Sequence, residues 1–293
     1  MARFRQRLRL LLGRVQRNVP DWALPSVVRI IDALDVIRRG VWRFVHRGPP
    51  IPRWSMRRRV GSPTLANYVE VRRRMADDLE GILERAGYPL RPGVRVLDWG
   101  CGSGRVALQL LERQELDLHG CDVDPEAIEW LRRVAPGGEW RFRVSGFAPP
   151  LSYPDDSFDV VYAASVFTHL NQADQLAWLR ELKRLLAPEG AALLTTAGPH
   201  AFSRPYWRDI PAHTAEELAP QLGRLDELGF VYASYSRDLA NRPQKYPGIS
   251  GDYGLSFQSE AWTRQRWSEV LEIDQVLPAA VGGYQDAVVA TRR

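Results

Sequence analysis

Three glycines alternate with other residues directly after a short apolar run. Residues 94–112 read VRVLDWGCGSGRVALQLLE, with Gly100, Gly102 and Gly104 at every second position and Asp98 two residues before the first of them. Glycine has no Cβ atom, so its backbone adopts positive φ and a ligand can lie against the peptide plane. A strand, a turn of this kind and a helix place a ligand beyond the carboxyl end of a parallel sheet. The pattern therefore predicts a small-molecule site that carries the negative charge of Asp98.

A dinucleotide is the first ligand that such a turn suggests. The fingerprint G-x-G-x-x-G is not met, because Arg105 occupies the position of its third glycine. A pyrophosphate would also lie close to Asp98, where like charges repel. A cationic ligand removes this repulsion, and S-adenosylmethionine has an ammonium and a sulfonium but no phosphate. A dinucleotide enzyme remains the alternative interpretation of the turn.

The motif D-x-G-C-G-x-G after a strand resembles motif I of the class I S-adenosylmethionine-dependent methyltransferases. Three later stretches resemble further motifs of this family in the same order: HGCDVDPEAI (119–128), PDDSFDVVYAASVFTHL (154–170) and LRELKRLLAPEGAALLTT (179–196). The resemblance covers about residues 60–197 and the C-terminal hairpin. It implies an enzyme that transfers a methyl group from S-adenosyl-L-methionine.

The resemblance also implies roles for individual residues. Asp98 would orient the methionine ammonium, residues 100–104 would wrap the methionine and the ribose, and Asp122 would bind the ribose hydroxyls. The other cofactor-binding residues that it implies are Gly100, Cys101, Gly102, Gly104, Val123, Gly146, Phe147, Ala164 and Ser165. Many family members have an acid after the third strand, whereas this chain reads VSGFAPPL at 144–151. Backbone groups or Ser145 would then receive the adenine amino group.

Methylation of a hydroxyl needs a base. His169, in SVFTHLN after the fourth strand, is the nearest candidate, and the alternative is a histidine that packs over the cofactor or bonds to the backbone. Further candidates that the sequence does not rank are His200, Tyr206, His213 and Tyr253. No CxxC spacing or pair of acids suggests a metal site.

Two subclasses of the family are disfavoured by their missing motifs. Amine methylation of nucleic-acid bases uses N/D-P-P-Y/F after the fourth strand, where this chain has AASVFTHL, and the APP of 148–150 follows the third strand instead. Cytosine C5 methylation needs a nucleophilic cysteine, and neither Cys101 nor Cys121 is suitably placed. We therefore expect O-methylation of a small molecule or saccharide. An RNA methyltransferase and a non-catalytic S-adenosylmethionine-binding scaffold are the alternatives.

The elements that must position these residues alternate between strand and helix. Strands are predicted at 94–97, 116–121, 140–144, 158–163 and 191–195, and helices at 62–86, 105–113, 125–134 and 173–186. Two final extended runs, VLEIDQVL and QDAVVATRR, predict an antiparallel hairpin. The fold class is α/β: a Rossmann-like three-layer sandwich with a mostly parallel seven-stranded sheet. Residues 198–267 form a long insertion, predicted to bind substrate.

The first 60 residues differ in charge from the rest. They contain fifteen arginines, no lysine and three aspartates, a net charge of +12, so residues 61–293 carry −7. We expect a basic, helical N-terminal arm (1–60) and a methyltransferase domain (61–293). The arm would either bind an anionic membrane surface or pack as a structural or dimerisation extension.

Two cysteines, no signal-peptide pattern and no run of about 18 apolar residues predict a cytoplasmic protein, with peripheral attachment to the inner face of a membrane as an option.

Overall fold

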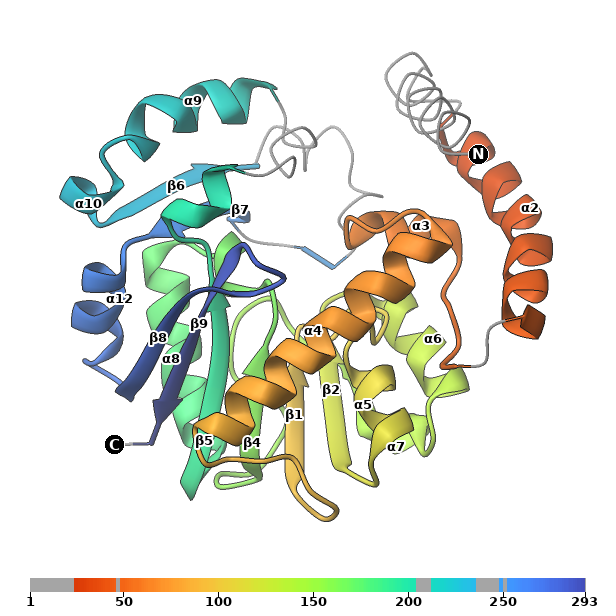
Figure 1. The fold of residues 1–293 in the computed structure, drawn as a ribbon, viewed down its shortest axis with the longest axis horizontal. Coiled ribbons are helices and arrows are strands. Elements are labelled where there is room, and N and C mark those ends of the chain that lie inside the picture. Colours follow the sequence, from red (N-terminus) through yellow and green to blue (C-terminus); the bar gives the residue numbers. More distant parts are fainter. Residues whose placement is uncertain (1–23, 46–47, 204–211, 236–247, 250–251, 293) are drawn as a thin grey trace. The chain divides into compact units, whose positions relative to one another are not determined.

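The computed structural model describes residues 24–45, 48–203, 212–235, 248–249 and 252–292 (Figure 1). Two compact units divide the chain, Met1–Leu65 and Ala66–Arg293. Residues 61–63 bond to the arm, which agrees with a division at Leu65. Arg57 donates to the Pro63 carbonyl, and Ser62 N donates to the Arg57 carbonyl. Arg57 also donates to the Pro52 carbonyl.

Within the described residues, seven strands form the main sheet, in the order β3-β2-β1-β4-β5-β9-β8. They are β1 (Arg95–Trp99), β2 (Asp117–Asp122), β3 (Phe142–Val144), β4 (Phe158–Ala163), β5 (Leu186–Thr196), β8 (Glu272–Val281) and β9 (Gln285–Thr291). Neighbours among the first five strands run parallel, whereas β9 is antiparallel to both β5 and β8. This order confirms the predicted fold class and brings the carboxyl ends of β1, β2 and β4 together at one edge.

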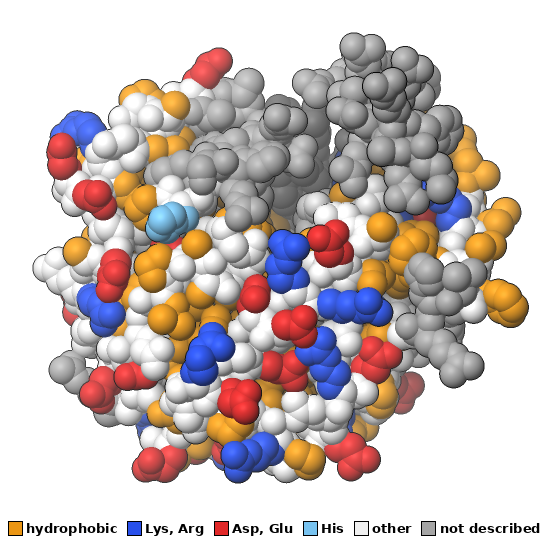
Figure 2. Space-filling model, viewed as in Figure 1, with side chains coloured by type: hydrophobic (Ala, Val, Ile, Leu, Met, Phe, Trp, Pro, Cys, Tyr) orange, Lys and Arg blue, Asp and Glu red, His pale blue; other side chains and the backbone are white. Residues whose placement is uncertain are grey.

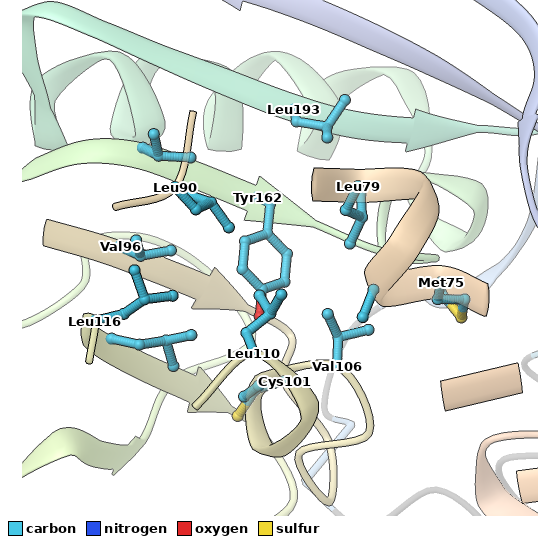
Figure 3. Packing of buried hydrophobic residues seen from close by; sticks show 14 of the residues in the cluster. Met75, Leu79, Leu90, Val96, Cys101, Val106, Leu110, Leu116, Tyr162 and Leu193 are labelled. Carbon is cyan, nitrogen blue, oxygen red and sulfur yellow. The ribbon is translucent and has the colours of Figure 1, made fainter. Parts of the chain in front are cut away.

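One face of the sheet is covered by α4 (Leu65–Arg85), α5 (Ala107–Arg113) and α6 (Pro125–Val134) (Figure 1). Apolar side chains from these helices and from the strands form a single buried cluster on this face. Figure 3 shows part of it, including Met75, Leu79, Val96, Leu110, Tyr162 and Leu193. Burial of this apolar surface is the main force that holds the helices on the sheet.

The opposite face packs against α8 (Gln172–Leu185) and α12 (Glu260–Trp267). Its buried cluster is rich in tryptophan: the rings of Trp99 and Trp178 lie 4.4 Å apart, and Phe167 contacts both Trp99 and Trp267. Two helical layers therefore enclose the sheet, as the alternation of elements predicted.

The third strand begins later than the sequence predicted. A helical turn, α7 (Gly138–Arg141), occupies the first two residues of the predicted strand 140–144, and β3 begins only at Phe142. Gly137 has a left-handed φ of 62°, and a Cβ on Gly138 would lie 2.6 Å from the Arg132 carbonyl oxygen. This tight approach to the end of α6 turns the chain, so the β-favouring Trp140 lies in a helical turn instead.

Residues 198–267 contain more regular structure than the sequence predicted. The described elements are η2 (Pro199–Ser203), α9 (Ala212–Leu222), α10 (Leu225–Leu228), β6 (Phe230–Ser234), β7 (Gly254–Gln258) and α12. β6 and β7 form a separate antiparallel pair with a small apolar core of its own. We call α9, α10, β6 and β7 the β6–β7 subdomain. Ser256 Oγ of β7 donates to the Phe167 carbonyl (2.7 Å), which ties the subdomain to the end of β4.

The surface of the second unit mixes charges of both signs. Figure 2 shows acidic and basic side chains interspersed over α4. Arg74 pairs with Glu70, and Arg113 pairs with Asp77 and Glu80. Pairs of this kind leave no broad basic field on this face.

The arm has two described helices, α2 (Leu24–Val45) and α3 (Trp54–Arg59). Arg57 of α3 is 1% exposed and donates to both carboxylate oxygens of Asp35 in α2 (2.9 and 2.8 Å). Ser55 binds Asp32 through its backbone N–H and its hydroxyl. Residues 1–23 of the predicted helical arm lie outside the described residues. In the described part of the chain, no helix has the length and apolar character that a membrane span requires.

Candidate functional site

The glycine turn after β1 is closely packed. Gly100, Gly102 and Gly104 have φ values of 77°, 51° and 72°. A Cβ on Gly100 would lie 2.3 Å from a methyl carbon of Val166, and one on Gly104 equally close to a methyl carbon of Leu131. Larger residues would therefore meet both backbone strain and steric overlap. The turn needs glycine for its own geometry as well as for any ligand.

Asp98 lies in β1, immediately before the turn, and is 3% exposed. The pKa of its carboxyl is raised from 3.8 to about 7, chiefly by burial and also by the nearby charge of Asp122. The charge of Arg105 and a hydrogen bond from the Ala107 backbone lower this pKa, but no arginine or lysine among the described residues forms an ion pair with Asp98. The Tyr162 hydroxyl also lowers it, without reaching ordinary hydrogen-bond geometry. Asp98 is thus a buried acid with no cation of its own.

Asp122 ends β2 and connects it to the glycine turn. Its Oδ2 accepts a hydrogen bond from Gly102 N (2.7 Å), and its Oδ1 accepts one from Asp124 N (2.8 Å). Burial raises the pKa of Asp122 to about 6, although these hydrogen bonds lower it. Each carboxylate oxygen has a further lone pair. The group can therefore bind ligand hydroxyls without losing its backbone partners.

The two acids together define what the turn can hold. Asp98 and Asp122 lie close enough for the charge of one to raise the pKa of the other. A ligand with a cation near Asp98 and hydroxyls near Asp122 would relieve this repulsion. S-adenosylmethionine has both groups, so the residues fit the cofactor that the sequence predicted.

The end of β4 has a constrained backbone. Ser165 has a φ of 64°, in the left-handed region that non-glycine residues rarely adopt. Its N–H donates to Thr195 Oγ1 (2.7 Å), and its hydroxyl contacts the Gln285 amide (2.8 Å to Nε2). Residues from β5 and β9 therefore hold this conformation, a form of strain that is common at functional sites. Ala164 and Ser165 are half-buried here.

His169 lies in a short 3-10 helix, η1 (Phe167–His169), and is bound to the β6–β7 subdomain. Its Nδ1 lies 2.7 Å from the carbonyl oxygen of Gly254. A carbonyl can only accept, so Nδ1 carries the proton and Nε2 keeps a free lone pair. Burial lowers the pKa of His169 to about 4, so the ring is neutral at pH 7. The ring stacks on Tyr253 at 4.7 Å.

The residues predicted to bind adenine lie beside the end of β2. Ser145 N donates to the Asp122 carbonyl (2.9 Å), which places residues 145–147 next to Asp122. Gly146 is exposed and Phe147 half-buried. Val123 contacts a residue that the sequence did not indicate: a Cβ on Gly248 would lie 1.8 Å from the Val123 carbonyl oxygen.

The remaining candidates differ in what the structure describes of them. Burial raises the pKa of Asp286, and the charge of His200, in η2, opposes this rise. Tyr253 contacts His169, whereas Tyr206 and the side chain of His213 lie outside the described residues. Cys101 and Cys121 are buried free thiols whose pKa is raised by burial. In the described part of the chain, no three His, Cys, Asp or Glu side chains gather as metal ligands.

Sequence reasoning missed Thr195 and Gln285, which hold Ser165. The QDAVV run that contains Gln285 predicted a strand. Nothing local indicated that its first residue reaches the end of β4, 120 positions earlier in the chain. The only indication in the sequence is that a polar residue, Gln285, begins a run of apolar residues predicted to form a buried strand. Such a residue needs a polar partner.

Comparison with known sequences identifies the central part of the chain. Residues 96–190 match a family described as a methyltransferase domain. The chain is 35% identical over 148 residues to malonyl-[acyl-carrier protein] O-methyltransferase of Halorhodospira halophila, covering 47% of this chain and 48% of that protein. It is 33% identical over 132 residues to 27-O-demethylrifamycin SV methyltransferase of Amycolatopsis mediterranei, covering 44% and 46%. The match thus spans about half the length of these relatives.

Solved structures agree on the fold. The magnesium protoporphyrin IX methyltransferase ChlM of Synechocystis, solved with bound SAH, has a TM-score of 0.50 at 17% identity, over 88% of this chain and 100% of that one. A chain of the complex between the Haloferax volcanii Trm112 methyltransferase activator and a methyltransferase has a TM-score of 0.52 at 18% identity, over 81% and 93%. At such identities these similarities show the fold alone. Residues 96–190 thus match a methyltransferase domain, in a chain that has the fold of the class I S-adenosylmethionine-dependent methyltransferases.

Proposed function

We propose that the protein methylates a hydroxyl group of a small molecule or saccharide. The observation that carries the cofactor part of this proposal is Asp98, a buried acid beside the glycine turn with no cation of its own. When bound, S-adenosylmethionine supplies an electrophilic methyl group on its sulfonium. Asp98 would hold the ammonium of the cofactor, and Asp122 would accept hydrogen bonds from its ribose hydroxyls.

His169 supports oxygen as the acceptor atom. Its Nε2 is unprotonated, because the Gly254 carbonyl accepts the proton of Nδ1 in a hydrogen bond. Nε2 makes no hydrogen bond with the described residues. A pKa near 4 makes the ring a weak proton acceptor. We therefore assign Nε2 to accept the hydrogen bond of the acceptor hydroxyl, which orients the oxygen lone pair and receives the proton as the oxygen is methylated.

The β6–β7 subdomain is proposed to bind the acceptor. Leu170 pairs with Tyr253, and His169 bonds to Gly254. The subdomain therefore contacts the residues that follow β4. The stacked rings of His169 and Tyr253 offer an apolar surface with polar edges. A surface of this kind suits the planar or sugar-ring acceptors of small-molecule enzymes.

The names of the relatives do not agree on the acceptor atom. Two have names that specify oxygen, malonyl-[acyl-carrier protein] O-methyltransferase and 27-O-demethylrifamycin SV methyltransferase. Others are named phosphoethanolamine N-methyltransferase and sterol 24-C-methyltransferase. Because the names of these relatives include oxygen, nitrogen and carbon as methyl acceptors, our choice of oxygen rests on His169.

Calorimetric titration with S-adenosylhomocysteine tests the cofactor site, with NAD as the control ligand. We expect binding of S-adenosylhomocysteine alone, and binding of NAD alone would overturn the proposal. A screen of hydroxylated acceptors for S-adenosylhomocysteine release then tests catalysis. His169→Ala should retain cofactor binding and lose at least about tenfold in turnover. Normal turnover of this variant would remove His169 from the mechanism, and cofactor binding without release for any acceptor would favour a non-catalytic scaffold.

A further inference from the structure

One side of α2 presents a continuous apolar row to solvent. Its members recur at intervals of four, three, four and three residues, and each is at least 60% exposed: Ile30, Leu34, Ile37, Val41 and Phe44. At about 3.6 residues per turn these side chains project within about 80° of one another. Figure 2 shows hydrophobic side chains gathered along this helix. A row of this length on an exposed helix marks an interaction surface.

The acids of α2 lie on the opposite side, where α3 binds them. Asp32 and Asp35 are the only acids between residues 24 and 45. Asp32 accepts two hydrogen bonds from Ser55, and Asp35 is paired with Arg57 and Arg39. The segment that follows α2 therefore neutralises its carboxylates, and the apolar side is left without negative charge.

Arginines flank the row on both sides. Arg29 and Arg38 project about 90° to either side of it, are exposed, and form no ion pair with the described residues. The face thus combines apolar side chains with unpaired positive charge. An anionic bilayer surface is complementary to both, since helices of this kind lie in the headgroup region with their apolar side buried. We propose that this face of α2 binds a membrane surface rich in anionic lipid.

A second copy of the chain fits this face less well. The spacing of the row would allow two helices to pair, but paired helices gain specificity from opposite charges beside the apolar seam. Here both flanks carry arginine and neither carries an acid, because Asp32 and Asp35 point to α3. Two copies would therefore place positive charges beside one another.

Co-sedimentation of the full chain with vesicles tests this proposal. The assay needs no methyl transfer, so its outcome is independent of the proposed activity. We expect binding to phosphatidylglycerol-rich vesicles and little binding to phosphatidylcholine vesicles. Ile37→Glu should weaken binding at least about tenfold, because it places a charge in the buried row. Arg38→Gln should weaken it about fivefold.

Val36→Glu is the matched control for Ile37→Glu. Val36 is 57% exposed on the same helix but lies about 100° away from the row, so this variant adds the same charge outside the row and should weaken binding no more than Arg38→Gln does. Leu34→Glu repeats the test at a second position of the row. S-adenosylhomocysteine titration of each variant shows that the domain is intact and separates this proposal from the proposed activity.

Three outcomes would overturn the proposal. The first is no binding of the native chain to anionic vesicles. The second is equal binding of Ile37→Glu and Val36→Glu, which would assign lipid binding to other basic residues of the arm. The third is a dimer in sedimentation equilibrium that Ile37→Glu dissociates, which would make a second copy the occupant of this face.

Discussion

Two aspartates, one in each unit, are equally buried and differ in what neutralises them. Asp35 in the arm and Asp98 in the methyltransferase domain are both 3% exposed. Asp35 receives two hydrogen bonds from the buried Arg57 guanidinium. Asp98 has no cationic partner among the described residues, and its pKa rises to about 7. The charge of Asp35 is balanced by an ion pair within the chain, whereas Asp98 would gain an ion pair only when a ligand brings a positive charge.

The difference has a thermodynamic consequence for the domain. Because the folded state raises the pKa of Asp98 from 3.8 to about 7, it binds this proton more tightly than the unfolded chain. The free energy of unfolding of the ligand-free domain should therefore fall as pH rises from about 4 to 7. A bound cation should restore this stability at neutral pH.

Removing Arg57, the buried partner of Asp35, should have the largest effect. Arg57→Met leaves the buried Asp35 with Arg39 as its remaining ion-pair partner, so the stability of the arm should fall by up to about 3 kcal/mol. Hydrogen exchange of residues 24–59 measures this loss. The double variant Asp35→Asn, Arg57→Met should recover part of it, and unchanged exchange in Arg57→Met would contradict the interpretation of the pair as structural.

Neutralising Asp98 should harm ligand binding more than folding. Asp98→Asn removes a buried charge, so the ligand-free protein should melt at an equal or higher temperature at pH 8. Its affinity for S-adenosylhomocysteine should fall at least tenfold, about 1.4 kcal/mol. Asp159→Asn is a control, since Asp159 is an exposed acid paired with Arg95 in the same sheet. Unchanged affinity in Asp98→Asn would show that this carboxyl does not hold the ammonium.

The affinity of the native protein should depend on pH. The ligand ammonium needs the ionised form of Asp98, whose pKa is about 7, so affinity should rise about fivefold between pH 6 and 7 and about twofold more before it levels off near pH 8. Calorimetry across this range measures the slope. Asp98→Asn should flatten the profile, and a native profile that is already flat would break the contrast with Asp35.

The smallest effect should come from the second acid of the site. Asp122 raises the pKa of Asp98, so Asp122→Asn should move the midpoint of the affinity profile to lower pH by less than about one unit. Affinity should also fall at every pH, because Asp122 is proposed to bind the ribose. A midpoint that moves upward would mean that Asp122 acts on Asp98 by some route other than charge.

Local pattern predicted the parts of the fold that depend on local chemistry. The glycine turn, the strand before it and the helix after Asp124 follow from residues adjacent in sequence; Asp124 caps that helix through Glu126 N and Ala127 N. The turn α7 was missed because it depends on how closely Gly138 approaches Arg132. A close approach between backbones leaves little trace in the pattern of apolar residues.

Local sequence pattern indicated only the proposed cofactor residues of the candidate site. Asp98 and Asp122 belong to motifs of known spacing, and the structure adds their burial and mutual charge effect. The contact of His169 with Gly254 joins residues 85 positions apart, and that of Ser165 with Gln285 joins residues 120 apart. Such pairings depend on how the subdomain and the C-terminal strands pack, which no single stretch of sequence encodes.

The bond from His169 to Gly254 also bears on how the proposed activity could be re-engineered. The histidine tautomer is set by a main-chain carbonyl, which persists when side chains around it are exchanged. Gly254 itself must stay, because a Cβ there would lie 2.1 Å from the Ala233 carbonyl oxygen. A library that randomises the side chains of the β6–β7 subdomain and keeps Gly254 would thus vary acceptor preference while the imidazole keeps its orientation. If His169 accepts the proton as proposed, acceptor selectivity and chemistry could then be changed separately by directed evolution.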